Sequence, residues 1–182
     1  MDPIAEVLAL PFDEVVLIEL RVIVGQIRSL NQSIAELEKT ITDQGSKVEG
    51  HKSLTSIKGI GKITGAILLR VIGDVNDFPD ESHLASYFGI VPRVSNSNQT
   101  ERCGRIHKRG SKPGRTALVQ SALIAANYSL YLRNFYERVK ARRGTGKAII
   151  ALARKFLGII YRTLKHKWVF EDFPNFVLAE GA

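Results

Sequence analysis

Apolar residues recur along the first part of the chain with a strict heptad spacing. Steps of four and three residues alternate over about four heptads, and polar residues fill most of the other positions. Because a helix that packs on its own domain usually has a wider apolar stripe, we favour a dimerising coiled-coil arm over that alternative. The apolar positions are Val16, Leu20, Ile23, Ile27, Leu30, Ile34, Leu37 and Ile41, with Val48 one heptad further.

A second apolar pattern surrounds two closely spaced glycines, Gly59 and Gly61. Apolar residues at helical spacing lie on both sides of this turn, so the segment 54–69 resembles a helix-hairpin-helix motif. Glycine lets a backbone approach a phosphate closely, and the following helix offers free N–H groups and a positive dipole end. Together with Lys58 and Lys62, this pattern predicts contact with a DNA backbone. The alternative is a purely structural turn that packs against a neighbouring helix.

The last third of the chain predicts two helices joined by a linker. The first helix runs from about residue 112 to about residue 140, with Ser111 as its N-cap and Pro113 in its first turn. Residues 142–147 form the linker, and an amphipathic helix covers about residues 147–166. One stripe of the last helix is basic and has no acidic residue, whereas solvated faces usually mix charges, so we expect this stripe to face nucleic acid. Its members are Lys147, Arg154, Lys155, Arg162 and Lys165.

Charge is divided unevenly along the chain. The formal net charge is +8, yet residues 1–50 hold four Lys or Arg and nine Asp or Glu. Residues 93–167 hold 18 Lys or Arg against only two acidic residues. This asymmetry indicates a nucleic-acid partner, bound by phosphate neutralisation and counterion release, rather than a merely solubilising surface.

Composition argues against several other classes of protein. No window approaches the roughly 18 apolar residues of a membrane span, and the acidic start lacks the features of a secretory signal. We therefore expect a cytoplasmic protein with no membrane partner. The single cysteine, Cys103, excludes intramolecular disulfides, and the four histidines lie far apart, so we expect no metal ligands in this chain.

A polar stretch covers residues 90–110 and predicts a long loop with room for two short strands. Its serines, Ser95 and Ser97, lie among arginines that are able to bind a scissile phosphate and to offset charge in a transition state. A serine in such a loop is, on residue type alone, more often a turn former than a nucleophile. The basic residues expected to contact nucleic acid in and after this stretch are Arg93, Arg102, Arg105, Lys108, Arg109 and Arg115.

These patterns together predict a mainly α protein. Residues 1–50 form a coiled-coil arm, and residues 51–170 form a helical domain with a helix-hairpin-helix motif. The long polar loop of this domain has room for a short β-hairpin. Residues 171–182 form a tail.

Several ordered pieces of the sequence resemble a known family. They are Ile57-Lys-Gly-Ile-Gly61, Ile72-Gly-Asp74 with Phe78, Leu84-Ala-Ser-Tyr-Phe-Gly-Ile-Val-Pro92, the serine-rich loop, Lys108-Arg-Gly-Ser-Lys-Pro-Gly-Arg115, and Lys147-Ala through Ala151. In this order and spacing, the stretch from Leu54 to about Trp168 resembles the C-terminal domain of the insertion-sequence one-ten family transposases, which include the eleven-eleven subgroup.

The resemblance implies DNA transposition by a serine that attacks DNA and becomes covalently linked to it, with a structured bridge RNA as guide in some members. The family's motif, Val-Pro followed shortly by Ser-Ser-Gly, aligns its second serine with Ser97. Ser97 is therefore the expected nucleophile and Ser95 the reserve. Asn96 and Asn98 depart from the motif.

The family also has an N-terminal RuvC-like domain whose DEDD acidic set binds Mg²⁺, followed by a coiled coil that the heptads resemble. No such acidic domain precedes the heptads in this sequence. We therefore expect the C-terminal part of a transposase, which binds DNA, forms a homodimer or a higher oligomer through the coiled coil, and is inactive alone. Mg²⁺ is expected only together with the N-terminal domain. The alternatives are a stand-alone, non-catalytic helix-hairpin-helix DNA-binding module and a basic RNA-binding protein.

Overall fold

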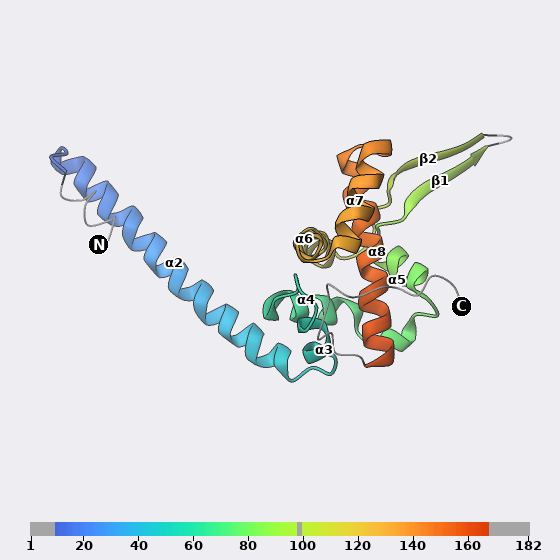
Figure 1. The fold of residues 1–182 in the computed structure, drawn as a ribbon. Coiled ribbons are helices and arrows are strands. Elements are labelled where there is room, and N and C mark those ends of the chain that lie inside the picture. The colour runs from blue at the N-terminus through green and yellow to red at the C-terminus, as the bar shows by residue number, and fades with distance from the viewer. Residues whose placement is uncertain (1–9, 98–99, 168–182) are drawn as a thin grey trace. The chain divides into compact units, whose positions relative to one another are not determined.

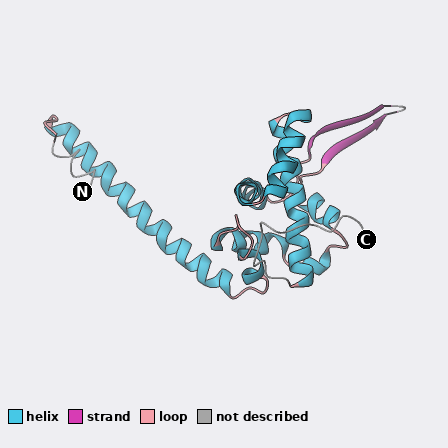
Figure 2. Cartoon of the chain, viewed as in Figure 1, coloured by secondary structure: helices cyan, strands magenta, loops and turns pink. Residues whose placement is uncertain are grey.

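The computed structural model describes residues 10–97 and 100–167, without the side chains of residues 93–105. The chain divides into two compact units, Met1–Asp43 and Gln44–Ala182. The described residues are mostly helical, and their two strands pair only with each other (Figures 1 and 2). The expected mainly α class is therefore confirmed.

The heptad segment forms one continuous helix, α2 (Glu14–Ser46), as its spacing predicts. Within the residues that the structure describes, most side chains of its apolar seam are exposed. The exposed fraction of the seam side chains ranges from 38% at Val16 to 62% at Leu30 and Leu37, and only Leu20 is half-buried. An apolar row of this length needs a partner to remove it from water.

Two helices joined by a tight turn follow, α3 (His51–Thr55) and α4 (Lys62–Ile72). A 3₁₀ helix, η1 (Val75–Asp77), and a short α-helix, α5 (Glu81–Tyr87), come next. Asp80 caps α5, because its carboxylate accepts hydrogen bonds from the backbone N–H groups of Ser82 and His83. The bonds from the His83 backbone and side chain keep the pKa of Asp80 below its ordinary value.

The helix expected over residues 112–140 is two helices, α6 (Lys112–Tyr128) and α7 (Leu130–Arg143). Ser111 caps α6 as expected, since its hydroxyl accepts from the Gly114 N–H at 3.1 Å. The break falls at Ser129, whose backbone is extended and whose hydroxyl accepts from the Leu132 N–H at 3.3 Å. A serine that starts a new helix in this way ends the helix before it, although the apolar spacing continues through both.

The prediction of a linker over residues 142–147 is also wrong. Helix α7 continues to Arg143, and α8 (Thr145–His166) begins after one intervening residue, Gly144. Gly144 has a φ of +79°, a conformation that glycine adopts without strain, and this allows so short a connection.

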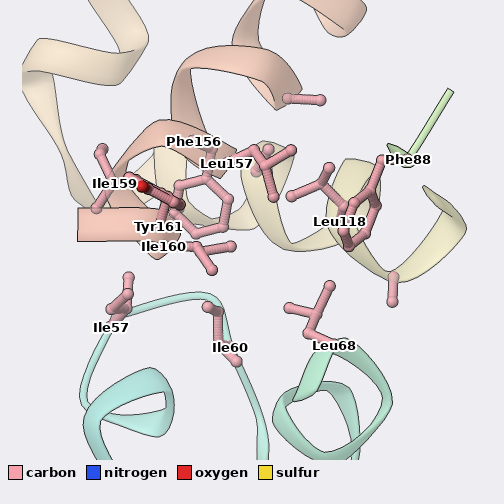
Figure 3. Packing of buried hydrophobic residues seen from close by; sticks show 14 of the residues in the cluster. Ile57, Ile60, Leu68, Phe88, Leu118, Phe156, Leu157, Ile159, Ile160 and Tyr161 are labelled. Atoms are coloured by element: carbon pink, nitrogen blue, oxygen red, sulfur yellow. The ribbon is translucent and has the colours of Figure 1, made fainter. Parts of the chain in front are cut away.

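The core of the second unit forms around α8, which packs against α3, α5, α6 and α7. Figure 3 shows Phe156, Leu157 and Ile160 of α8 among side chains from the other helices, with Ile57 and Ile60 pointing in from the turn before α4. Alanines line the buried face of α6, and such small side chains let other backbones approach closely. The amphipathic pattern of α8 predicts this buried face correctly.

The polar stretch contains the short hairpin for which it has room. Strands β1 (Pro92–Ser97) and β2 (Thr100–Ile106) pair antiparallel, with an irregularity between Pro92 and Val94. The hairpin connects α5 to α6 along the chain, and Figure 1 shows it extending away from the helices of the second unit.

Candidate nucleic-acid interface

Two glycines fix the base of the hairpin. Gly89 and Gly110 both have positive φ, +69° and +116°. A Cβ on Gly89 would overlap the carbonyl oxygen of Arg109, and a Cβ on Gly110 would overlap that of Tyr87. The two chain segments therefore touch backbone to backbone, and the N–H of Lys108 donates to the Gly89 carbonyl at 3.1 Å. This contact sets where the two strands leave the helices.

Arg115 supports the same base from α6. Its Nη1 donates to the Phe88 carbonyl at 3.1 Å, and its side chain is half-buried. The sequence pattern predicts Arg115 as a nucleic-acid contact, but this guanidinium already holds the end of α5. Lys108 and Arg109, predicted for the same surface, are exposed beside it.

The expected nucleophiles lie on strand β1. In the backbone register Ser95 is opposite Arg102, and Ser97 is opposite Thr100. The side chains of Ser95, Ser97, Arg93, Arg102 and Arg105 lie outside the described part of the structure. The roles assigned to these five residues therefore stay predictions.

Gly59 of the α3–α4 turn is a packing residue. Its φ is +104°, and a Cβ there would lie 2.8 Å from both the Ala125 nitrogen and the Ser121 carbonyl oxygen of α6. The turn thus rests directly on the backbone of α6. For Gly59 this geometry agrees with the structural alternative that the sequence left open.

Gly61 lies on the open side of the same turn. It is the N-cap of α4, no side chain caps the helix there, and nothing lies within 4 Å of where a Cβ would be. The side chains of Lys58 and Lys62 are exposed next to it. His51 positions this end of the helix, since its Nε2 donates to the Lys62 carbonyl at 2.9 Å. The predicted phosphate contact has room here, but contact with DNA stays a prediction.

The basic stripe of α8 is not a uniform free surface. Lys147 and Arg154 are exposed, whereas the Nζ of Lys155 lies 4.5 Å and 4.7 Å from the ring centroids of Tyr131 and Phe135 on α7. A lysine held over two rings in this way stabilises the α7–α8 packing.

The end of the stripe binds the segment around α5. Arg162 Nη2 lies 3.4 Å from Glu81 Oε2, and Lys165 Nζ donates to Asn76 Oδ1 at 3.0 Å. Nearby, the Tyr161 hydroxyl donates to the Phe78 and Pro79 carbonyls. The stripe itself has no acidic residue, but Glu81 of α5 pairs with it. Helical periodicity describes neighbours within one helix, so it does not predict a partner from so much earlier in the sequence.

A basic cluster that the sequence pattern assigns to a linker lies at the junction of α7 and α8. Arg142 and Arg143 end α7, and Lys147 lies in the first turn of α8. All three side chains are exposed. We call these three residues the α7–α8 basic end. The sequence has a dense run of Lys and Arg here. Because residues 142–147 were predicted to be a linker, the sequence did not indicate that these three side chains lie together at the junction of two helices.

Among the side chains that the structure describes, in residues 10–92 and 106–167, no three His, Cys, Asp or Glu come together as a group that could hold a metal ion. Within the same ranges, no helix combines the length and the apolar character needed to cross a membrane.

Comparison with known proteins identifies relatives for much of the second unit. Residues 51–137 match the family model described as "Transposase IS116/IS110/IS902 family". The "Insertion element IS110 uncharacterized 43.6 kDa protein" of Streptomyces coelicolor is 32% identical over 120 residues, which is 65% of this chain and 30% of that protein. The "Transposase for insertion sequence element IS1111A" of Coxiella burnetii is 29% identical over 142 residues, 74% of this chain and 38% of that protein.

A third relative has a different name. The "Pilin gene-inverting protein" of Moraxella lacunata is 37% identical over 127 residues, which is 65% of this chain and 38% of that protein. The matched part of the chain thus spans between 30% and 38% of the length of these three relatives. The resemblance found in the sequence motifs is confirmed.

Proposed function

Because residues 51–137 match the model of the transposase IS116/IS110/IS902 family, we propose that this chain takes part in DNA transposition or inversion and binds DNA directly. The relatives named as a transposase and as a gene-inverting protein support a recombination reaction on DNA. A bridge RNA, where one is used, would bind the same basic domain.

One observation carries the DNA-binding part of this proposal. The segments that form the open side of the α3–α4 turn hold no acidic residue, since none occurs between Gly50 and Gly73 or between Arg102 and Tyr136. Lys58 and Lys62 are exposed there, beside backbone N–H groups that no side chain caps. Positive charge together with free N–H groups suits a phosphate.

Fluorescence anisotropy with a labelled duplex tests this binding. We expect affinity that falls steeply as salt is raised, because each neutralised phosphate releases counterions. Binding that is absent, or that does not respond to salt, would contradict the proposal. A folded RNA of equal length, titrated in parallel, shows whether duplex DNA is preferred.

We also propose Ser97 as the nucleophile, with Ser95 in reserve. The serine Oγ would attack the phosphorus of a backbone phosphate in one DNA strand, and its hydroxyl proton would pass to a general base. The bond between that phosphorus and the leaving sugar oxygen would break. That oxygen would take up a proton, and a phosphoserine–DNA bond would join protein and strand. The support is the family motif and the position of both serines on β1. This strand belongs to the hairpin whose connection to the helices is fixed by Gly89 and Gly110.

Substitution separates catalysis from binding. In a recombination assay on the element's own DNA ends, with the chain reconstituted together with the family's N-terminal domain and Mg²⁺, Ser97→Ala is expected to abolish joined products while leaving DNA affinity within about twofold. Ser95→Ala, the matched control two residues away, is expected to keep both. Joined products from Ser97→Ala would refute the assignment, and their loss only with Ser95→Ala would transfer the role to Ser95.

The partner proposed for the seam of α2 is a second copy of the chain. An exposed 3.5-residue repeat matches itself, because each apolar side chain fits between those of an identical helix. Dimerisation would also bring two basic domains to one DNA molecule. Once the first domain is bound, the effective concentration of the second domain at a neighbouring site on the same DNA is raised.

A further inference from the structure

A shallow hollow of about 330 Å³ lies where the α3–α4 turn meets α6. One side is the turn itself, from Lys58 to Gly61, and the other side is the last part of α6. The two side chains that α6 contributes, Ile124 and Tyr128, belong to none of the predicted binding residues.

The packing of α6 explains why these two side chains are at the edge of the turn. Ser121 and Ala125 are buried against Gly59, and Tyr128 follows them on the same face at helical spacing. Ile124 is 46% exposed and Tyr128 is 56% exposed. A large aliphatic and an aromatic side chain therefore stand in water beside Lys58 and the start of α4.

The surroundings favour an anionic partner that also carries apolar rings. The exposed lysines and the uncapped N–H groups at the start of α4 attract a phosphate, and both segments lack acidic residues. The tyrosine ring and the Ile124 side chain offer a surface for a sugar or a base. A nucleotide presents these two kinds of group at neighbouring positions.

We propose that this hollow receives one nucleotide of the bound DNA strand. Its phosphate lies at the start of α4 between Lys58 and Lys62, and its sugar or unstacked base lies against Tyr128 and Ile124. This inference rests on the proposed DNA binding and adds a contact by residues outside the glycine turn. Because every base has a π-face, the contact adds affinity with little dependence on sequence.

The experiment compares the purified chain with its variants by anisotropy at several salt concentrations. Tyr128→Ala is expected to weaken DNA binding about tenfold, within the range found for losing a base–aromatic contact, and to leave the salt slope unchanged. Tyr128→Phe keeps the ring and is expected to bind within about twofold of wild type. Lys58→Ala with Lys62→Ala is expected to reduce the slope by about two.

Leu130→Ala is the control at an exposed apolar side chain. Leu130 is 67% exposed and begins α7, outside this hollow. This variant is expected to bind as wild type does. Circular dichroism and thermal melting verify that each variant is folded, which the exposure of Tyr128 leads us to expect.

The failures are distinguishable. If wild type binds DNA with a normal salt slope but Tyr128→Ala binds equally well, the nucleotide site is wrong and the proposed function stands. A loss with Tyr128→Ala that appears only with folded RNA overturns DNA as the occupant. If wild type shows no salt-dependent binding to DNA, the proposed function fails, and this inference fails with it.

Discussion

At the residue scale, two glycines only two positions apart have different physical roles. Gly59 has a left-handed backbone and lies against the backbone of α6, so any side chain there would be both strained and overlapping. Gly61 has a φ of −78°, which any residue adopts, and faces open space. The Gly-Ile-Gly pattern alone does not separate these roles, because they depend on contact with Ser121 and Ala125 of α6, far later in the sequence.

This difference predicts unequal effects on stability when each glycine is replaced with alanine. Gly59→Ala is expected to lower the free energy of unfolding by at least about 2 kcal/mol, through left-handed strain and overlap with α6. Gly61→Ala, the matched control, is expected to change it by no more than about 1 kcal/mol. Urea denaturation measures both. Equal stability of the two variants would contradict the packing described for Gly59.

At the element scale, the apolar seam side chains of the long helix α2 are mostly exposed in the described part of the chain. We expect wild type to be a dimer through this seam, and Leu30→Asp to raise the dimer dissociation constant at least about tenfold. Two carboxylates would face each other across the paired helices, and an apolar contact would be lost. Sedimentation equilibrium measures the change.

A nearby residue supplies the control. Gln32 is exposed and lies on the helix face opposite the seam, so Gln32→Asp adds the same charge and is expected to leave the dimer unchanged. A wild type that is monomeric at every concentration, or a Leu30→Asp variant that dimerises like wild type, would contradict this assignment of the seam.

Periodicity predicted the elements that depend on neighbours in the sequence. The continuous α2, the Ser111 cap and the buried face of α8 all come from patterns within one element. The break at Ser129 was missed because the apolar spacing continues across it. The bond between Arg162 and Glu81 was missed because 81 positions separate the partners, and only the packing of α5 on α8 brings them together.

The same limit applies to the candidate site. Lys58, Lys62, Lys147 and Arg154 are exposed, as nucleic-acid contacts need to be. Tyr128 was missed because a tyrosine at the end of a helix has no distinguishing sequence signal. Only the contact of the α3–α4 turn with α6 places it beside the lysines.

At the scale of the whole molecule, the basic charge belongs to the second unit and is divided between structural and free positions. Arg115, Lys155 and Arg162 are engaged in internal contacts. The α7–α8 basic end, Arg142, Arg143 and Lys147, is exposed. Net charge alone therefore overstates how many phosphates the chain can neutralise.

The central claim is that this chain binds DNA through its free basic side chains, and the salt dependence of duplex binding tests it most directly. Replacing Arg142, Arg143 and Lys147 together with alanine is expected to reduce the slope of log affinity against log salt by about three. Arg162→Ala is expected to leave the slope unchanged, because Glu81 already pairs with that charge. A wild type without salt-dependent binding, or a triple variant with the wild-type slope, would contradict the account.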